Sequence, residues 1–553
     1  HPSRVRRARR RRPRRVRLDV GGQRRAQDEL AGLGGDVLER AVLADDAALR
    51  LLEGEYEGYG LYIMPGGGAE QDADEWWEAM KKSTRRLIEK TGIGPEKIGG
   101  ISFCSQMQGL VLVDENGKAL RRPMSYMDQR AEKEFAECQT HGITVSGVNV
   151  LMLLKSLVRT RAASTSVKDP LWKYKWVRKH EPEVFKKVHK WLDVKEYLIC
   201  RCTGRFIMTR DSAYSTFLYD SRPGKGCWSR ELCKMYGVEF DHMPEIIECT
   251  DVAGPLSEEA AAELGLAPGC PVYGGGGDAT LIGVGAGCTE IGQTHIYSGT
   301  SGWVGTVIDS QKVDLVAMIA GIVGAQEGKY NYFAEMETAG KCFEWVKEHL
   351  VLDEIGIYLK KINVAESKET VYESLYDYMT DTIAAIPPGA GGVIFTPWLH
   401  GNRCPFEAPK AAGMFFNIKL DTGKTEMLRA VLEGICYHLR WMLECEDKKV
   451  KTGDTLRFVG GGALSRVTCQ ILADVTGRPV ETVASTKDVG AVGAAMLVAV
   501  GSGLIKDLSE AGKLIKPEGR YEPNAENKAL YDKNYEVFKN LYAANKKNFA
   551  ALN

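Results

Sequence analysis

The stretch "PVYGGGGDATLIGVG", residues 271–285, places one acidic residue, Asp278, directly after four glycines in an otherwise apolar segment of small residues. Residues 271–273 are typical of a short strand, and residues 279–285 of a helix built from small side chains. Four consecutive glycines add nothing to a hydrophobic core, but they leave room for a ligand beside the acid. The loop alone supports two interpretations equally: Asp278 acts on a bound substrate, or it caps the helix that follows.

Strands, glycine turns and helices alternate along the rest of the chain. In the first half we predict strands over residues 59–64, 98–105 and, around an Asn-Gly turn, 109–120, and helical segments over 72–92 and 169–192. In the second half we predict a hairpin over 294–307, a strand, turn and helix over 455–477, and helices over 424–446, 488–504 and 527–549. This alternation predicts an α/β fold, and 553 residues are too many for one core, which favours two domains.

The composition is ordinary for a globular protein, with 44% apolar and 26% charged residues. No apolar run approaches the ~20 residues of a membrane-spanning helix, so we expect neither a membrane role nor a signal peptide. The formal net charge is zero, but residues 1–50 carry +7 and the rest of the chain −7. An acidic body argues against nucleic acid as a partner.

The first fifty residues differ from everything after them. Ten of the first twenty residues are Arg, and the first 27 contain no Lys, which the rest of the chain uses freely. Three interpretations compete: a basic arm for nucleic acid or anionic membrane, a disordered tail, or a segment translated in the wrong reading frame. The abrupt change of composition near residue 50 favours the third.

Fourteen cysteines are scattered along the chain. None form a CxxC pair, and no set of His and Cys residues has the spacing of a zinc site. This usage indicates reduced thiols and a cytoplasmic location.

Three glycine turns follow predicted strands, at residues 274–277, 299–302 and 460–462. Glycine lets the backbone approach a ligand and point N–H groups at anionic oxygens, and the second turn adds the hydroxyls of Thr300 and Ser301. Neither a Walker A loop nor a GxGxxG fingerprint is present. Three such turns together favour a nucleotide site. Asp278 would then take the proton of an acceptor hydroxyl during phosphoryl transfer.

Several longer segments carry a family resemblance. They are "AEQDADEWWEA" (69–79), "ISFCSQMQGLVLVDENGKALRRPMSYMDQRAE" (101–132), "TPWLHGNRCPFEAPKAAGMFFNI" (396–418) with "LRAVLEGICYHLR" (428–440), "FVGGGALSRVTCQILADVTGRPV" (458–480) and "DVGAVGAAMLVAVGSG" (488–503). From about residue 51 to the C-terminus the chain resembles the FGGY carbohydrate kinases, most closely the xylulokinase branch.

The resemblance implies two ribonuclease-H-like domains, as in the actin and Hsp70 ATPases, with a cleft between them. The domains would span residues 51–288, holding the sugar and the catalytic base, and 289–553, holding ATP, with a hinge near 285–295. The implied activity is transfer of the ATP γ-phosphate to a sugar hydroxyl, with D-xylulose as the leading sugar. The implied partners are a sugar, ATP and Mg²⁺; a homodimer is an open alternative to a monomer.

The resemblance also assigns site residues. Asp278 is the implied catalytic base. The residues implied for sugar binding are Gln106, Met107, Gln108, Asp128 and Arg130. Those implied for ATP binding are Gly299, Thr300, Ser301, Gly302, Gly461, Gly462 and Ala463, with Gln470 a weaker candidate. Each has a structural alternative. Asp128 and Arg130 could form an ion pair, Met107 and Trp303 could fill a core, and the Asn402–Arg403 pair could stabilise a loop.

The chain departs from the family near the sugar pocket, including the segment "TRDSAYSTFLYD" (209–220), and at its start. Gln108 stands where xylulokinases usually have His, and Tyr126 where they usually have Trp, so the sugar is open: ribulose, glycerol and gluconate are alternatives. The usual first strand with its Mg²⁺-handling Asp-x-Gly-Thr is also missing. Asp19 in "RLDVGGQ" matches it only in part. If the altered start is genuine, a non-catalytic, actin-like nucleotide-binding protein is the alternative to a kinase.

Overall fold

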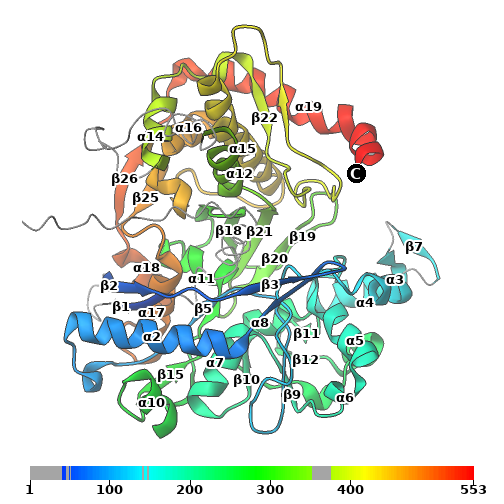
Figure 1. The fold of residues 1–553 in the computed structure, drawn as a ribbon, viewed down its shortest axis with the longest axis vertical. Coiled ribbons are helices and arrows are strands. Elements are labelled where there is room, and N and C mark those ends of the chain that lie inside the picture. Colours follow the sequence, from blue (N-terminus) through cyan, green and yellow to red (C-terminus); the bar gives the residue numbers. More distant parts are fainter. Residues whose placement is uncertain (1–39, 45–48, 50, 140–141, 146–147, 352–374) are drawn as a thin grey trace, which may run out of the picture.

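The computed structural model describes residues 40–44, 49, 51–139, 142–145, 148–351 and 375–553. Asp19 and nearly all of the arginine-rich start lie outside the described residues. The first half of the chain, blue to green in Figure 1, forms one lobe, and most of the second half, yellow to red, forms the other. Strands of the second half lie between the two.

The first half alternates short strands and helices. Its elements are β1 (Arg40–Ala44), β2 (Leu51–Tyr56), β3 (Leu61–Met64), β4 (Gly68–Gln71), α2 (Ala73–Thr91), β5 (Cys104–Ser105), β6 (Val111–Val113), α3 (Glu132–Gln139), β7 (Thr144–Val145), β8 (Val148–Asn149), α4 (Val150–Thr160), α5 (Pro170–His180), α6 (Pro182–Phe185), β9 (Lys190–Leu192), α7 (Val194–Thr203), β10 (Ile207–Thr209), α8 (Arg210–Ser215), β11 (Tyr219–Asp220), β12 (Cys227–Trp228), α9 (Arg230–Tyr236), β13 (Glu245–Ile247), β14 (Val252–Pro255), α10 (Glu258–Leu264), β15 (Pro271–Tyr273), β16 (Gly276–Gly277) and α11 (Asp278–Gly285).

The second half contains longer strands. Its elements are β17 (Thr294–Ser298), β18 (Gly302–Ile308), β19 (Val313–Asp314), β20 (Ile319–Val323), β21 (Tyr330–Met336), α12 (Gly340–Val346), α14 (Leu375–Ala384), β22 (Ile394–Thr396), β23 (Met414–Phe416), α15 (Lys424–Asp447), β24 (Leu456–Val459), α16 (Arg466–Thr476), β25 (Val480–Val483), α17 (Val489–Gly501), α18 (Leu508–Leu514), β26 (Pro517–Tyr521) and α19 (Lys528–Leu552). The predicted α/β class is therefore confirmed.

Local sequence signals fix several of these elements. Helix α2 begins where the Asp72 side chain accepts the Asp74 N–H at 3.0 Å, and it ends at Gly92 in the left-handed conformation, as the sequence predicts. Its Trp76 and Trp77 are buried. The predicted strand over 98–105 is largely wrong, because only β5 pairs as a strand and Ile101 adds one isolated bridge.

The predicted helical segment over 169–192 is correct only in part. Helices α5 and α6 cover residues 170–180 and 182–185, but Lys190–Leu192 forms strand β9, antiparallel to β6. The physical reason is burial: Trp191 and Leu192 have no exposed surface, and the β6 strand offers them both a ladder and an apolar face.

The second half is built on one eight-stranded sheet, in the order β19-β20-β21-β18-β17-β24-β25-β26. Strands β17, β24 and β25 are parallel, and β17 and β18 form an antiparallel hairpin in which Ser298 faces Gly302. The predicted hairpin over 294–307 is thus confirmed. Because β17 and β24 are parallel, the glycine turns that follow them lie at the same edge of the sheet.

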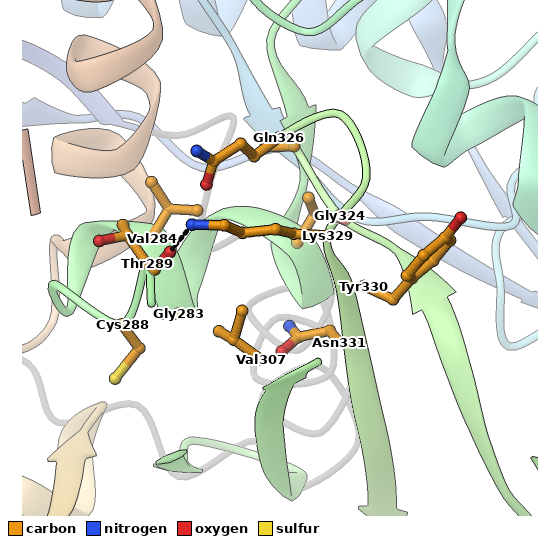
Figure 2. Close-up of a pocket in the computed structure, with 12 residues that line it drawn as sticks. Gly283, Val284, Cys288, Thr289, Val307, Gly324, Gln326, Lys329, Tyr330 and Asn331 are labelled. Carbon is orange, nitrogen blue, oxygen red and sulfur yellow. Dashed lines mark hydrogen bonds between the residues drawn. The ribbon is translucent and has the colours of Figure 1, made fainter. Parts of the chain in front are cut away.

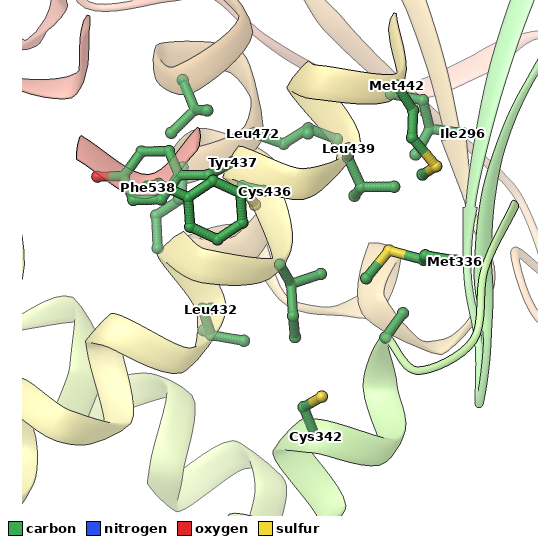
Figure 3. Packing of buried hydrophobic residues seen from close by; sticks show 14 of the residues in the cluster. Ile296, Met336, Cys342, Leu432, Cys436, Tyr437, Leu439, Met442, Leu472 and Phe538 are labelled. Carbon is green, nitrogen blue, oxygen red and sulfur yellow. The ribbon is translucent and has the colours of Figure 1, made fainter. Parts of the chain in front are cut away.

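Helices cover both faces of this sheet. On one face α15 packs its apolar side against the strands, with α12, α16 and α19 completing the core, as Figure 3 shows for Ile296, Met336, Cys342, Leu432, Cys436, Tyr437, Leu439, Met442, Leu472 and Phe538. On the other face α11 and α17 pack against Trp303 and Val459. All fourteen cysteines are free, and Cys227 is the one with an exposed side chain. Among the described helices, none is both long and apolar enough to cross a bilayer.

Helix α17 belongs to the second half of the chain but packs against the first. Its residues share a core with Cys104, Cys249 and Leu281, and Figure 1 shows it beside β1 and β5. At the crossing with α11, a Cβ atom on Gly285 would lie 1.7 Å from the Val489 carbonyl oxygen. The two helix backbones therefore touch with no side chain between them.

This contact predicts a large loss of stability for Gly285→Ala. A backbone oxygen cannot rotate out of the way, so the helices must separate, at a cost of about 3 kcal/mol or more. Urea unfolding followed by circular dichroism measures it. Gly99→Ala is the matched control, because Gly99 is exposed and its Cβ would meet nothing within 4 Å; we expect a change within about 0.5 kcal/mol there. Equal effects in both variants would contradict the packing argument.

Candidate functional site

The N–H groups of the first glycine turn are all used inside the protein. Gly274 donates to the Asp251 carbonyl at 3.0 Å, Gly275 to the Cys249 carbonyl at 3.1 Å and Gly276 to the Phe103 carbonyl at 2.9 Å. Gly277 donates to a side chain, Asp211 Oδ2, at 2.7 Å. The expectation that this turn points its N–H groups at a phosphate is therefore wrong.

These glycines serve close packing instead. Gly275 has φ +69°, and a Cβ there would lie 2.4 Å from the Phe103 carbonyl oxygen. At Gly277 a Cβ would lie 2.1 Å from the Met107 sulfur. Strand β16 can thus pair in parallel with β5, Gly277 beside Ser105, which brings Asp278 next to the loop that begins at Gln106.

Asp278 is the first residue of α11, not its N-cap, which is Gly277. Its Oδ1 accepts the Ala279 N–H at 2.8 Å. The carboxyl group is enclosed by protein although part of the residue stays accessible. Burial raises the pKa of Asp278 to about 7; the Ala279 N–H opposes this rise, and the negative charges of Glu335 and Asp211 add to it. A carboxyl that titrates near neutrality suits proton transfer.

The Gln106–Gln108 loop contains an amide pair with spare hydrogen-bonding capacity. Gln106 Nε2 donates to Gln71 Oε1 at 2.5 Å, and both side chains are buried. Gln106 Oε1 and Gln71 Nε2 have no partner among the described residues. Buried amide atoms are normally satisfied, so the unpartnered donor of Gln71 and the unpartnered acceptor of Gln106 are unusual. Sequence analysis did not single out Gln71, which lies in the quoted segment 69–79.

Two buried charged residues shape the same loop. Gln108 adopts φ +64°, and its carbonyl accepts Lys173 Nζ at 2.8 Å, while Gly109 N–H donates to Asp193 Oδ1 at 2.9 Å. Burial lowers the pKa of Lys173 to about 8, partly offset by Asp128 and other nearby carboxylates. A non-glycine residue held in the left-handed region marks a constrained loop. Sequence reasoning missed Lys173 and Asp193, since each lies inside an apolar pattern.

Asp128 and Arg130 form the ion pair that we weighed as the structural alternative. Asp128 has no exposed surface, and it accepts Arg130 Nη2 at 2.6 Å and the Ala69 N–H at 2.8 Å. Arg130 also reaches Glu70 at 2.8 Å. The Asp128 carboxylate is thus committed to groups of the protein, which favours a structural role.

The second glycine turn keeps its two hydroxyls available, although the Gly299 N–H donates to the Ser301 carbonyl at 3.0 Å. Thr300 and Ser301 are half-buried, and neither hydroxyl has a hydrogen-bond partner within the described part of the chain. The turn is held from behind, because Gly340 N–H donates to the Gly299 carbonyl at 2.7 Å and Ala339 N–H to the Thr300 carbonyl at 2.9 Å. The two hydroxyls of this turn are therefore free to donate to a phosphate.

The third glycine turn lies against the end of β17, where the second turn begins. A Cβ on Gly462 would lie 2.9 Å from Ser298 Oγ, while Gly461 is exposed with open space around it. Ala463 is buried behind them. Gln470, the weaker candidate, donates to Asp474 at 2.7 Å and to the Glu522 carbonyl at 2.8 Å. The structure therefore places the third turn beside Ser298, the residue that precedes the 299–302 turn, and gives Gln470 partners within the protein.

One charged contact joins the two halves of the chain, and a second lies within the second half. Lys168 Nζ lies 3.2 Å from Glu337 Oε2, and Arg403 Nη1 donates to Glu335 Oε2 at 2.9 Å. Glu335 is near enough to Asp278 to affect its pKa, so Arg403 belongs to these surroundings. Trp303 is a packing residue: it is buried and donates to His295 Nε2 at 3.0 Å.

A small pocket lies beside α11 where it meets the sheet of the second half. Figure 2 shows it between Gly283 and Val284 of α11 and Val307 and Asn331 of the sheet. Asn331 Nδ2 donates to the Ala279 carbonyl at 3.0 Å. Strand β21 therefore holds the first turn of the helix that carries Asp278.

Comparison with known proteins identifies this arrangement. The N-terminal domain of the FGGY family of carbohydrate kinases matches residues 34–285, and the C-terminal domain of that family matches residues 295–502. The chain belongs to the FGGY family of carbohydrate kinases and is a sugar phosphotransferase; membership implies ATP as the phosphoryl donor. The match begins at residue 34, so it includes part of the segment before residue 51.

Individual relatives include kinases for different sugars. The chain is 29% identical to a xylulose kinase from Staphylococcus epidermidis, covering 92% of this chain and 96% of that one, and 26% identical to a gluconokinase from Bacillus licheniformis, covering 92% and 94%. Its fold matches the ligand-bound xylulose kinase from Lactobacillus acidophilus with a TM-score of 0.79 at 24% identity, covering 93% and 97%. A two-domain FGGY kinase fold is therefore confirmed.

The raised pKa of Asp278 predicts a pH-dependent gain in stability for Asp278→Asn. The pKa of this carboxyl is higher in the folded chain than in the unfolded chain. Above the pKa of the unfolded chain the group therefore lowers the free energy of unfolding, and this loss grows until the pH reaches about 7. The variant should therefore have the higher Tm at pH 8, and the two Tm values should converge as the pH falls to 4. Asp309→Asn, at an exposed position, is the control. A gain that grows toward acid pH would contradict the assignment.

Proposed function

We propose that the protein transfers the γ-phosphate of ATP to the terminal hydroxyl of a ketopentose, most specifically D-xylulose, giving D-xylulose 5-phosphate. The observation that carries this proposal is the position of Asp278: a carboxyl with a pKa near neutrality, at the start of a helix and beside the Gln106–Gln108 loop. The residues 51–288 would hold the sugar and the base, and 289–553 would hold ATP.

In the proposed reaction the sugar hydroxyl oxygen bonds to the γ-phosphorus as the bond from that phosphorus to the β-phosphate oxygen breaks. ADP leaves with those electrons, and the hydroxyl proton passes to the Asp278 carboxylate. Thr300 and Ser301 would donate to the phosphate oxygens, and Gly461 and Gly462 would let the adenosine approach the backbone.

The sugar would lie against Gln106, Met107 and Gln108. The spare donor of Gln71 and the spare acceptor of Gln106 suit a hydroxyl group, which both donates and accepts. A site that pairs each hydroxyl rejects sugars that lack one. Kinases for gluconate are among the relatives, so a kinase for another sugar or polyol is the second candidate.

Mg²⁺ is part of the proposal because it accompanies ATP, held chiefly by phosphate oxygens and water. Asp19, the carboxylate proposed for it, lies outside the described residues. Within the described ranges no three His, Cys, Asp or Glu side chains are grouped as metal ligands, so no further residue is assigned to Mg²⁺.

Asp278→Asn, like Asp278→Ala, should abolish turnover while sugar binding survives. The substitution removes the proton acceptor, and we expect kcat to fall by roughly 10² to 10⁴, the range that general-base catalysis contributes. ADP release over a panel of xylulose, ribulose, glycerol and gluconate measures turnover, and calorimetry measures sugar binding. Wild-type turnover by the variant would overturn the role of Asp278, and a different preferred sugar would overturn xylulose.

Gln71→Leu tests the sugar pocket. It removes the spare donor and the partner of Gln106 at similar volume, so KM for the sugar should rise roughly tenfold, the equivalent of one or two hydrogen bonds. KM for ATP should stay within about twofold. Gln129→Ala, at an exposed glutamine, should change neither. An unchanged sugar KM in folded Gln71→Leu protein would remove Gln71 from the pocket.

A further inference from the structure

A buried carboxylate that the proposed reaction does not use is hydrogen-bonded to the residue just before the proposed base. Asp211 belongs to α8 and is almost fully buried. Its Oδ2 accepts the Gly277 N–H at 2.7 Å, and its Oδ1 accepts the hydroxyl of Thr209 and, at 3.5 Å, the thiol of Cys249. Sequence analysis had not assigned any role to this aspartate.

The bond to Gly277 differs from those of the other glycines in the turn. The three preceding N–H groups donate to main-chain carbonyls, which no substitution removes. Gly277 alone is held by a side chain, and it is the residue that immediately precedes Asp278. Its peptide sets the direction in which α11 begins, so Asp211 controls where the Asp278 carboxyl group points.

A buried ammonium keeps Asp211 ionised. Lys195 Nζ lies 4.0 Å from Asp211 Oδ1 and donates to Glu196, Thr209 and, at 2.7 Å, to Ser212. Burial opposes ionisation, but Lys195 and the hydrogen bonds from Thr209 and Gly277 lower the pKa of Asp211 below its usual value. Asp211 is thus a fixed anion over the range in which Asp278 titrates.

Other groups near Asp278 complete its electrostatic surroundings. Glu335 lies near it on β21. The Cys104 thiol lies near it on β5, and because burial raises the pKa of this thiol well above its usual value, the thiol stays neutral. The two anions, Asp211 and Glu335, therefore face Asp278 from different elements.

We infer that Asp211 is a positioning residue for the phosphoryl transfer: its carboxylate fixes the Gly277–Asp278 peptide and adds a constant negative charge beside the base. The inference rests on the proposed role of Asp278.

The test is the pH profile of kcat/KM for the sugar at saturating MgATP. Asp211→Asn keeps the size of the side chain and an acceptor oxygen but removes the charge. The acid limb of the profile, where kcat/KM rises with pH, should therefore shift to lower pH by roughly 0.5 to 1 unit. Asp211→Glu keeps the charge but moves the carboxylate, so kcat should fall roughly tenfold to a hundredfold while the limb stays. Asp220→Asn, at a buried aspartate paired with Arg222, should leave the limb in place.

The outcomes separate this inference from the proposed function. If Asp278→Asn retains turnover, the base assignment fails and the inference with it. If Asp278→Asn is inactive but Asp211→Asn has the wild-type limb and Asp211→Glu the wild-type kcat, the inference alone is wrong. Thr209→Val perturbs the same carboxylate more gently, and it carries the test if Asp211→Asn does not fold: a limb at the wild-type pH with unchanged kcat would again overturn the inference.

Discussion

Direct contact between main-chain segments is the constraint on which this structure depends. From Gly274 to Gly285 the chain passes so close to its neighbours that side chains would collide with carbonyl oxygens of Phe103 and Val489. The glycines pair β16 with β5 at one end and press α11 onto α17 at the other. Because these contacts are made by backbone atoms, they leave little freedom for the segment between them, and Asp278 occupies that segment.

The charges around Asp278 follow from this rigidity. A carboxyl enclosed by protein near Asp211 and Glu335 holds its proton more tightly than one in water. A loose loop would swing the group toward solvent and relieve the effect. Here Asp211 holds the turn from the first half of the chain, and Asn331 holds the helix from the second, so both halves determine the position of one carboxyl group.

Much of this fold was predictable from local signals. The capped helix α2, the hairpin of β17 and β18 and the long helix α15 follow from periodicity, capping residues and a glycine turn. The strand at Lys190–Leu192 could not be predicted from local signals, because it exists only through pairing with β6. Residue patterns likewise pointed to Asp278 and to the turn of Thr300 and Ser301.

The partners of these residues were beyond the sequence. Gln71, Lys173 and Asp211 lie 35, 65 and 66 residues from the groups they contact, and nothing local marks those pairings. The first glycine turn shows the opposite error, since its composition suggests free N–H groups that the fold in fact consumes. Hydrogen-bond satisfaction is a property of the assembled chain.

The crossing of α11 and α17 also fixes the direction in which α11 points. Asp278 lies seven residues from Gly285, so the end of α11 that carries the carboxyl group is about 10 Å from the crossing. A tilt of about ten degrees at the crossing would displace that end of the helix by roughly 2 Å, which is most of the donor–acceptor distance of a hydrogen bond. The tightness of the helix crossing therefore decides how precisely the carboxyl group can be placed against a reacting hydroxyl.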